Sequence, residues 1–204
     1  GRFYLIVGDT SVGKTRVAQE IAKIDIAENK IIAYIDLEYV YDQVWWERCG
    51  IDIDKVLIAR PESGEKAIDI IVALIEAEVG LIIIDSLAAL VPEAEMEENA
   101  DYNPMAGRAS LISSKMPKII SKASMHGTIV LGINQIRHSM KLGQPETYPG
   151  GEAQMFYSSA RLRLRSGGWI KDGDERVGFK LAIEIRKNKI GDPFKDCEID
   201  FRFD

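Results

Sequence analysis

Residues 4–22 read YLIVGDTSVGKTRVAQEIA, an apolar run followed by a glycine-bounded loop and an amphipathic segment. The apolar run at residues 4–7 has the character of a buried strand, and residues 14–27 have helical spacing. Residues 8–15, GDTSVGKT, fit the pattern G-x-x-x-x-G-K-[ST]. In this pattern backbone N–H groups surround phosphate oxygens at the positive N-terminal end of the following helix. A merely structural glycine turn is the alternative, but the position of the motif between a strand and a helix favours a phosphate site.

Two side chains of this loop have the chemistry to hold a nucleoside triphosphate and its metal ion. Lys14 would place a positive charge beside the β- and γ-phosphates, and Thr15 would offer its hydroxyl to Mg²⁺. The residues that we expect to contact the nucleotide here are Gly8, Asp9, Thr10, Ser11, Val12, Gly13, Lys14, Thr15 and Arg16.

Short apolar runs alternate with helical stretches along the first two thirds of the chain. Nearly continuous apolar runs are typical of strands that are covered on both faces, so the pattern predicts an α/β fold with a mostly parallel sheet flanked by helices. The expected strands are residues 3–7, 31–36, 55–59, 81–85 and 127–134, and the expected helices are residues 14–27, 40–49, 64–78 and 105–125.

The pattern changes after residue 157. Residues 159–165, 177–189 and 197–203 alternate polar and apolar side chains with period two, and KDGDE at residues 171–175 indicates a turn between the first two runs. We expect antiparallel strands here that extend the sheet. Residues 93–104 and 136–151 are expected to form exposed loops, each after the end of a core strand, where open α/β sheets place their ligands.

Length and composition narrow the class. The chain has 204 residues, 46% of them hydrophobic, so it can bury one core and is expected to be a single domain. Its net charge of −6 gives no global attraction to nucleic acid or membrane, although a local basic groove remains possible. No apolar stretch reaches the roughly 20 residues of a spanning helix. Cys49 and Cys197 are far apart in the sequence, which suits a reducing, cytoplasmic location and offers no metal site.

Acidic residues follow two of the expected strands. Asp85 ends the run LIIID and can orient Mg²⁺ or its water; capping the next turn is the alternative, but the phosphate loop favours the metal role. Hydrolysis also needs a group that orients water. Asp36 is expected to terminate its strand, whereas Glu38 lies beyond the strand end and could reach the γ-phosphate. Taken alone, Glu38 could equally be a solvated loop acid.

Several stretches together resemble the RecA family of DNA recombinases from bacteria and their phages. The similarity runs from about residue 3 to residue 203, with the motifs in the right order, and it implies the ATPase core of that family as a single domain over residues 1–204. The N-terminal segment that docks on a neighbouring subunit and the C-terminal lobe are expected to be absent. The stretches that carry the resemblance are IDLEYVYD (35–42), GIDIDKVLIARPESGEKAID (50–69), IIIDSLAALVPEAEME (82–97), GINQIR (132–137), QPETYPGGEAQMFYSSARLRLR (144–165) and IRKNKIGDPFK (185–195).

The resemblance implies a role for each matching residue at the nucleotide. Asp85 matches the acid on the metal side, and Glu38 matches the catalytic base. Asp42 and Trp45 match positions that contact adenine, and a flat indole can stack on a purine. One of Trp45 and its neighbour Trp46 is expected to belong to the core instead.

The resemblance also implies residues that act beyond one subunit's own site. Gln135 matches the residue that senses the γ-phosphate and passes the signal to the next loop. Lys187 and Lys189 match a basic pair that reaches the γ-phosphate of the neighbouring subunit, although their spacing alone indicates only a solvated strand edge.

The two exposed loops match the family's DNA-binding loops, at about residues 97–108 and 137–151. Basic side chains there could meet phosphates, and apolar ones could wedge between bases. The second loop is about two residues shorter than usual, and Ser110 stands where an arginine is expected. The DNA-binding residues that we expect are Met105, Arg108, Arg137, His138, Lys141, Gly150 and Gly151.

The resemblance therefore predicts an ATP-dependent recombinase that uses Mg²⁺, forms a homo-oligomeric helical filament on single-stranded DNA with ATP between subunits, and pairs that strand with double-stranded DNA. A ring-forming relative, such as a replicative helicase, is the main alternative. The motifs NQIR (134–137) and RKNKIGDPF (186–194) favour the recombinase. A regulator that binds ATP without hydrolysis is a third possibility, which the joint presence of Thr15, Glu38 and Asp85 argues against.

Overall fold

A computed structural model describes residues 1–96, 103–138 and 146–203 of the chain, with backbone alone for His138. Within these residues, eight strands form one sheet in the order β10-β9-β8-β1-β5-β4-β2-β3, and β6 and β7 form a separate small pair. The six strands from β8 to β3 in this order run parallel, whereas β9 and β10 are antiparallel additions. The predicted α/β class, with a mostly parallel sheet extended by C-terminal antiparallel strands, is confirmed.

The bounds of the elements are as follows. The strands are β1 (Arg2–Gly8), β2 (Ile32–Asp36), β3 (Val56–Ala59), β4 (Leu81–Asp85), β5 (Ile129–Gln135), β6 (Arg137–His138), β7 (Glu146–Thr147), β8 (Ala160–Asp172), β9 (Glu175–Asn188) and β10 (Asp196–Arg202). The helices are α1 (Lys14–Ala27), α2 (Gln43–Arg48), α3 (Gly64–Glu76), α4 (Glu93–Met96), α5 (Pro104–His126) and α6 (Ala153–Tyr157), with 3-10 turns at Ile53–Lys55 and Leu87–Ala89.

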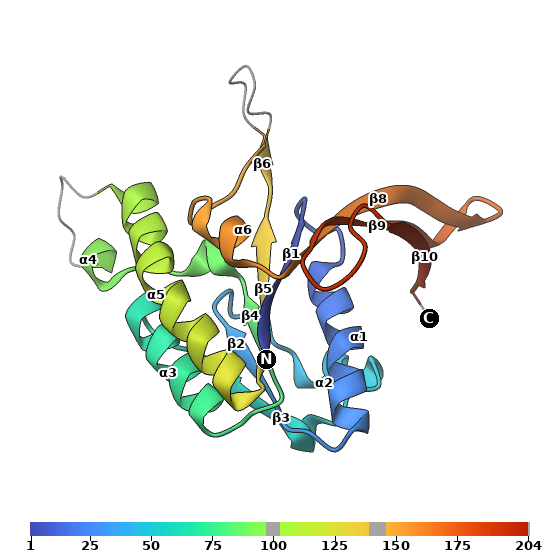
Figure 1. Ribbon diagram of the computed structural model, residues 1–204. Coiled ribbons are helices and arrows are strands. Elements are labelled where there is room, and N and C mark those ends of the chain that lie inside the picture. The colour runs from blue at the N-terminus through green and yellow to red at the C-terminus, as the bar shows by residue number, and fades with distance from the viewer. Residues whose placement is uncertain (97–102, 139–145, 204) are drawn as a thin grey trace.

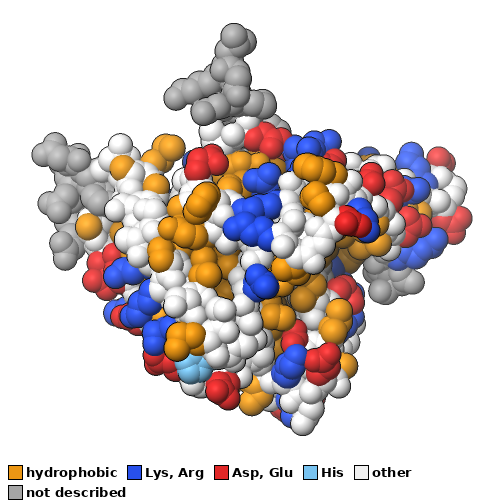
Figure 2. Space-filling model, in the orientation of Figure 1, with side chains coloured by type: hydrophobic (Ala, Val, Ile, Leu, Met, Phe, Trp, Pro, Cys, Tyr) orange, Lys and Arg blue, Asp and Glu red, His pale blue; other side chains and the backbone are white. Residues whose placement is uncertain are grey.

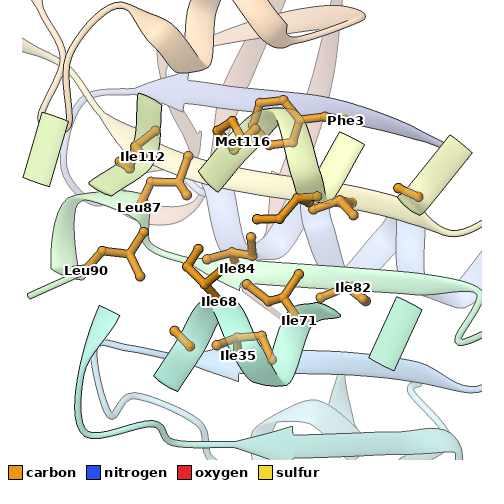
Figure 3. Packing of buried hydrophobic residues seen from close by; sticks show 14 of the residues in the cluster. Phe3, Ile35, Ile68, Ile71, Ile82, Ile84, Leu87, Leu90, Ile112 and Met116 are labelled. Carbon is orange, nitrogen blue, oxygen red and sulfur yellow. The ribbon is translucent and has the colours of Figure 1, made fainter. Parts of the chain in front are cut away.

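Helices cover both faces of the sheet, which explains why its central strands are apolar throughout. Helices α3 and α5 lie on one face and α1 and α2 on the other (Figure 1). Figure 3 shows the first core, in which Ile68 and Ile71 of α3 lie close to Ile82 and Ile84 of β4. The second core joins α1 and α2 to the sheet and includes the buried Trp46. The two cores fix the central strands, whose carboxyl ends carry the acidic residues singled out above.

Local sequence signals set the helix ends. The side chain of Ser63 accepts a hydrogen bond from the backbone N–H of Lys66 and starts α3. Asn103 accepts from the N–H groups of Met105 and Ala106, and Pro104 occupies the first turn of α5. Asparagine before a first-turn proline is a favoured helix start.

The strong helix start at Asn103 corrects one boundary. The exposed loop expected at residues 93–104 is helical at Glu93–Met96, and α5 begins at Pro104, one residue before the expected start at residue 105. Residues 105–108, expected at the end of a DNA-binding loop, therefore lie on the first turns of a helix. The other expected loop, residues 136–151, contains the short pair between β6 and β7. The turn between β8 and β9 falls at residues 173–174, within the expected KDGDE stretch.

Candidate nucleotide site

A cleft of about 480 Å³ opens beside the carboxyl ends of β1, β2 and β4. Residues 10–16 of the glycine-rich loop and the start of α1 form one wall. Glu38, Trp45, Asp85 and Gln135, which the sequence analysis assigned to this site, also line the cleft. The fold therefore brings together residues from four separate parts of the chain.

The loop has the shape expected of a phosphate cradle. Gly13 adopts φ 97°, a left-handed conformation that glycine tolerates best, and Lys14 begins α1 directly after it. The ammonium of Lys14 donates to the backbone carbonyls of Asp9 at 2.6 Å and Gly8 at 3.2 Å. Burial lowers the pKa of Lys14, and the carboxylates of Asp85 and Glu38 oppose this shift. The lysine thus lies across the inside of the loop, with its charge at the place where a phosphate chain would pass.

Thr15 and Asp85 form the candidate metal site. The hydroxyl of Thr15 donates to Oδ2 of Asp85 at 2.6 Å, and the hydroxyl of Tyr34 donates to the same oxygen at 2.9 Å. Asp85 and Tyr34 are both nearly inaccessible to solvent. Burial raises the pKa of Asp85, and the hydrogen bonds from Thr15 and Tyr34 counteract that rise. The peptide bond between Asp85 and Ser86 is cis.

This donor set fits Mg²⁺ with a nucleotide rather than a metal ion held by protein alone. Mg²⁺ usually takes one or two protein oxygens and completes its shell with phosphates and water. In the part of the chain that the structure describes, no group of three or more His, Cys, Asp or Glu side chains could hold a metal ion. One hydroxyl and one carboxylate, next to a phosphate loop, meet the requirement for a phosphate-bound ion.

Glu38 lies on the turn that follows β2. Its carboxylate accepts a hydrogen bond from the hydroxyl of Ser86 at 2.5 Å, which fixes it beside the end of β4. The turn itself is held by Asp36, whose buried carboxylate accepts from the backbone N–H of Val40 at 3.0 Å and forms an ion pair with Arg60. Asp36 therefore terminates the strand, as predicted, and Glu38 faces the cleft.

The two tryptophans of α2 lie in different environments. Trp46 is buried and packs edge-on against Tyr34, with ring centroids 4.7 Å apart, whereas Trp45 is 52% exposed and lines the cleft. Asp42 caps α2 by accepting from the backbone N–H of Trp45 at 2.8 Å. The prediction that one tryptophan belongs to the core is confirmed, and Asp42 has a local structural task in this structure.

Sequence reasoning did not assign Tyr34, Phe179 or Phe201 to the cleft that they line. Tyr34 was read only as part of a strand, and its contact with Asp85 follows from the pairing of β2 with β4. Phe179 of β9 and Phe201 of β10 stack with centroids 5.0 Å apart and line the cleft from the antiparallel extension. The guanidinium of Arg16 lies 5.5 Å from the Phe201 ring centre. Period-two alternation marks these strand residues as facing one side but does not say what that side contacts.

Gln135 ends β5 and lines the same cleft. It pairs with Gly8 across the parallel ladder between β1 and β5, which places it beside the start of the phosphate loop. The chain continues from Gln135 into Arg137, the first residue of β6. One residue thus lies between the cleft and the second of the expected DNA-binding loops.

Lys187 and Lys189 lie outside this cleft, at the end of β9. The ammonium of Lys187 donates to the carbonyls of Met155 at 2.7 Å and Phe156 at 2.8 Å, at the end of α6. Burial, followed by the charges of Lys189 and Arg161, lowers the pKa of Lys187. The Lys189 ammonium lies 5.9 Å from the ring centre of Phe156, which is 72% exposed. Figure 2 shows basic side chains beside hydrophobic ones near the middle of the face that carries α6.

The first expected DNA-binding segment is described only from residue 103 onward. Met105 is exposed on the first turn of α5. Arg108 instead forms an ion pair with Glu95 at 2.6 Å and donates to the carbonyl of Ala88 at 3.1 Å. In this structure its guanidinium therefore ties α5 to α4 and to the turn after β4.

The second segment is described at its two ends. Arg137 is exposed and pairs with Thr147, while Lys141 and the side chain of His138 lie outside the described residues. Gly150 and Gly151 have φ values of 81° and 77° and pack against α5, where an added Cβ would lie 2.3 Å from Cδ1 of Ile112 and 3.1 Å from Cβ of Ala109. The glycines thus anchor the end of the loop on the domain.

A strand, a glycine-rich loop and a helix in a parallel sheet define the class of P-loop domains. Within that class the chain belongs to the RecA family, because the family model described as the RecA N-terminal domain matches residues 1–204.

Curated relatives agree with this placement. The chain is 38% identical over 206 residues to Protein RecA of Chlorobium chlorochromatii, covering 100% of this chain and 58% of that protein. It is also 38% identical over 201 residues to Protein RecA of Colwellia psychrerythraea, covering 97% of this chain and 58% of the relative. The chain therefore spans a little over half the length of these relatives. Among the described residues, no helix has the length and apolar character needed to cross a membrane.

Proposed function

We propose that this chain is the ATPase core of a cytoplasmic DNA recombinase, in which ATP binding controls the affinity for DNA. The observation that carries the proposal is the cluster at the head of the phosphate loop. Thr15 and Asp85 meet at 2.6 Å on one side, and the Glu38 carboxylate is fixed by Ser86 on the other. Mg²⁺ bound with the nucleotide would neutralise charge on the β- and γ-phosphates.

The residues of the chain have distinct tasks in this proposal. The backbone N–H groups of the loop and the Lys14 ammonium bind the phosphates, and Thr15 and Asp85 hold the metal ion directly or through water. The Glu38 carboxylate orients a water molecule for attack on the γ-phosphate and accepts its proton. Trp45, which is exposed and lines the cleft, supports an adenine ring, and Asp42 lies at the same end of α2.

The proposal includes assembly as a helical filament on single-stranded DNA that pairs with homologous duplex. Lys187 and Lys189 lie outside the chain's own cleft, which supports a role on the nucleotide of a neighbouring subunit. In that role Lys187 must exchange the carbonyls of Met155 and Phe156 for phosphate oxygens. The proposed phosphate contacts of the second DNA-binding loop are Arg137, His138 and Lys141. The DNA backbone would also be approached at the anchored end of this loop by Gly150 and Gly151.

In this proposal Arg108 can contact DNA only after its ion pair with Glu95 is broken. The exposed Met105, one turn earlier on α5, is free to contact a base without any such exchange. The family match does not favour the ring-forming alternative.

The direct test is release of inorganic phosphate from ATP with and without single-stranded DNA. We expect hydrolysis that rises when DNA is added, together with open helical filaments in electron micrographs. Closed rings would support the helicase alternative. Nucleotide binding without any phosphate release under either condition would contradict the proposal and support a non-catalytic regulator.

A further inference from the structure

Two buried side-chain amides, Asn134 and Gln154, meet beneath the end of the second loop. The Asn134 amide nitrogen donates to Oε1 of Gln154 at 2.7 Å and to the carbonyl of Pro149 at 2.8 Å. The Gln154 amide nitrogen donates to the carbonyls of Pro149 at 2.7 Å and Gly151 at 2.9 Å. Both side chains are fully buried. One of these four hydrogen bonds joins β5 to α6, and the other three join these elements to residues 149–151, which we call the return segment.

The network uses the full donor capacity of both amides. Each NH₂ group has two hydrogens, and each hydrogen has an acceptor at 2.7–2.9 Å. A buried amide that loses such a partner away from water pays a large desolvation cost. The return segment is therefore expected to move together with the end of β5 and with α6 rather than to separate from them.

The same network reaches the nucleotide cleft through the backbone. The Asn134 side-chain oxygen accepts from the N–H of the next residue, Gln135, at 2.9 Å. The N–H of Ile136 donates to the carbonyl of Gly8 at 3.1 Å, at the first residue of the phosphate loop. Gln135 is thus held between the phosphate loop on one side and the amide network on the other.

We propose that Asn134 and Gln154 are positioning residues that transmit the nucleotide state from Gln135 to the return segment of the second loop. The inference rests on the proposed function, because it needs ATP in the cleft and DNA at the loop. A shift of the end of β5 on ATP binding would move the return segment with it. The position of the second loop relative to bound DNA would change as a result. Figure 1 shows α6 beside β5, where the strand runs toward β6.

The test is the variant Gln154→Leu, which keeps the apolar bulk of the side chain and removes its hydrogen bonds. DNA affinity is measured by titration of fluorescent single-stranded DNA with ATP and with ADP. Nucleotide coupling in proteins is usually about 5–150-fold in affinity, and we expect the parent to lie in that range. In Gln154→Leu we expect the ATP-to-ADP ratio of DNA affinities to fall to within about twofold of one, well below that range. ATP affinity and DNA-independent hydrolysis should stay at the parent level.

Ser158→Ala is the matched control. Ser158 is buried at the end of the same helix, and its hydroxyl donates to the carbonyl of Met155 at 3.0 Å without contact to the return segment. Its loss should leave the ATP-to-ADP ratio unchanged. If Gln154→Leu weakens DNA binding equally with both nucleotides, the glutamine is merely structural and the inference is wrong. If the parent protein binds DNA with the same affinity in ATP and in ADP, the proposed function itself fails. This result differs from failure of the inference, in which the parent shows the difference and Gln154→Leu keeps it.

A second measurement needs no variant. Hydrogen exchange of residues 146–151 is compared in the parent with ATP and with ADP, in the absence of DNA. The inference predicts a difference in protection between the two nucleotides that extends to the Gly151 amide, which donates to Tyr148 in this structure. Equal protection of these residues with both nucleotides would overturn it, even if Gln154→Leu does not fold.

Discussion

The hydroxyl of Thr15 donates a hydrogen bond to the Asp85 carboxylate at 2.6 Å, although the two residues are 70 positions apart in the chain. Thr15 lies in the first turn of α1, and Asp85 ends β4, two strands away from β1 in the sheet. The contact exists because parallel strands bring their carboxyl ends to one edge. This is the physical reason why a loop motif and a distant aspartate can share one metal ion.

Tyr34 is expected to increase the affinity of the Thr15 and Asp85 pair for Mg²⁺. The variant Tyr34→Phe removes the hydroxyl that donates to Asp85 and keeps the ring that packs on Trp46. Loss of a partner that orients a metal ligand typically costs about 10–100-fold in metal affinity, and we expect the low end of that range. The measurement is nucleotide binding as a function of Mg²⁺ concentration. The Mg²⁺ concentration that gives half-maximal binding should be higher in Tyr34→Phe than in the parent. Tyr41→Phe, in the same aromatic group, is the control, and an equal half-maximal concentration in both variants would contradict the role of Tyr34.

Glu38 is expected to affect the hydrolysis of ATP but not the binding of ATP or DNA. The variant Glu38→Gln keeps an oxygen that can accept from Ser86 but removes the charge that orients and deprotonates water. Hydrolysis should slow by about 10²-fold or more, the usual scale for a positioned acid–base group, while ATP and DNA binding persist. The rate of phosphate release at saturating ATP checks this. Hydrolysis at the parent rate would show that another group is the base.

Lys187 is expected to act on a neighbouring subunit. In the variant Lys187→Ala, nucleotide affinity of the isolated subunit should stay nearly unchanged, while DNA-stimulated hydrolysis should be lost. Lys189→Ala should behave in the same way, and Lys171→Ala, at the distant end of β8, should not. Equilibrium nucleotide binding and phosphate release with DNA are compared for all three variants. Loss of nucleotide binding by the isolated subunit would place these lysines in the chain's own site instead.

Gly150 is expected to be a position where stability depends on the absence of a side chain. The added methyl group in Gly150→Ala would lie 2.3 Å from Cδ1 of the buried Ile112, at φ 81°. Gly127→Ala is matched, because its φ is 78° and a methyl group there would meet nothing within 4 Å. Left-handed strain alone costs on the order of 1 kcal/mol, so Gly127→Ala should lose about that much free energy of unfolding. Gly150→Ala should lose clearly more in denaturant titrations, and equal losses would contradict the packing argument.

Much of this fold could be predicted from local patterns. The continuous apolar runs ending at Asp36 and Asp85 marked strands buried on both faces, and both are confirmed as β2 and β4. The start of α1 at Lys14 followed from the loop motif. These features depend on residues close together in sequence, so a single chain is enough to reveal them.

Contacts between distant elements were not predictable in the same way. The contact of Tyr34 with Asp85 depends on strand register, and the position of Phe201 in the cleft depends on how β10 pairs with β9. The ion pair of Arg108 with Glu95 depends on how α5 packs beside α4. In each case the residue type was visible, but its partner was set by the tertiary arrangement.

The measurement that tests the central claim most directly is the affinity for single-stranded DNA with ATP and with ADP, in the parent and in Gln135→Ala. The Gln135 amide lines the nucleotide cleft one residue before Ile136 and two before the second loop. ATP can strengthen DNA binding only to the extent that it favours the DNA-binding state, by about 5–150-fold in typical coupled systems. We predict a ratio in that range for the parent and the same DNA affinity with both nucleotides for Gln135→Ala, which should still bind ATP. A preserved ATP-to-ADP ratio in Gln135→Ala would contradict the account.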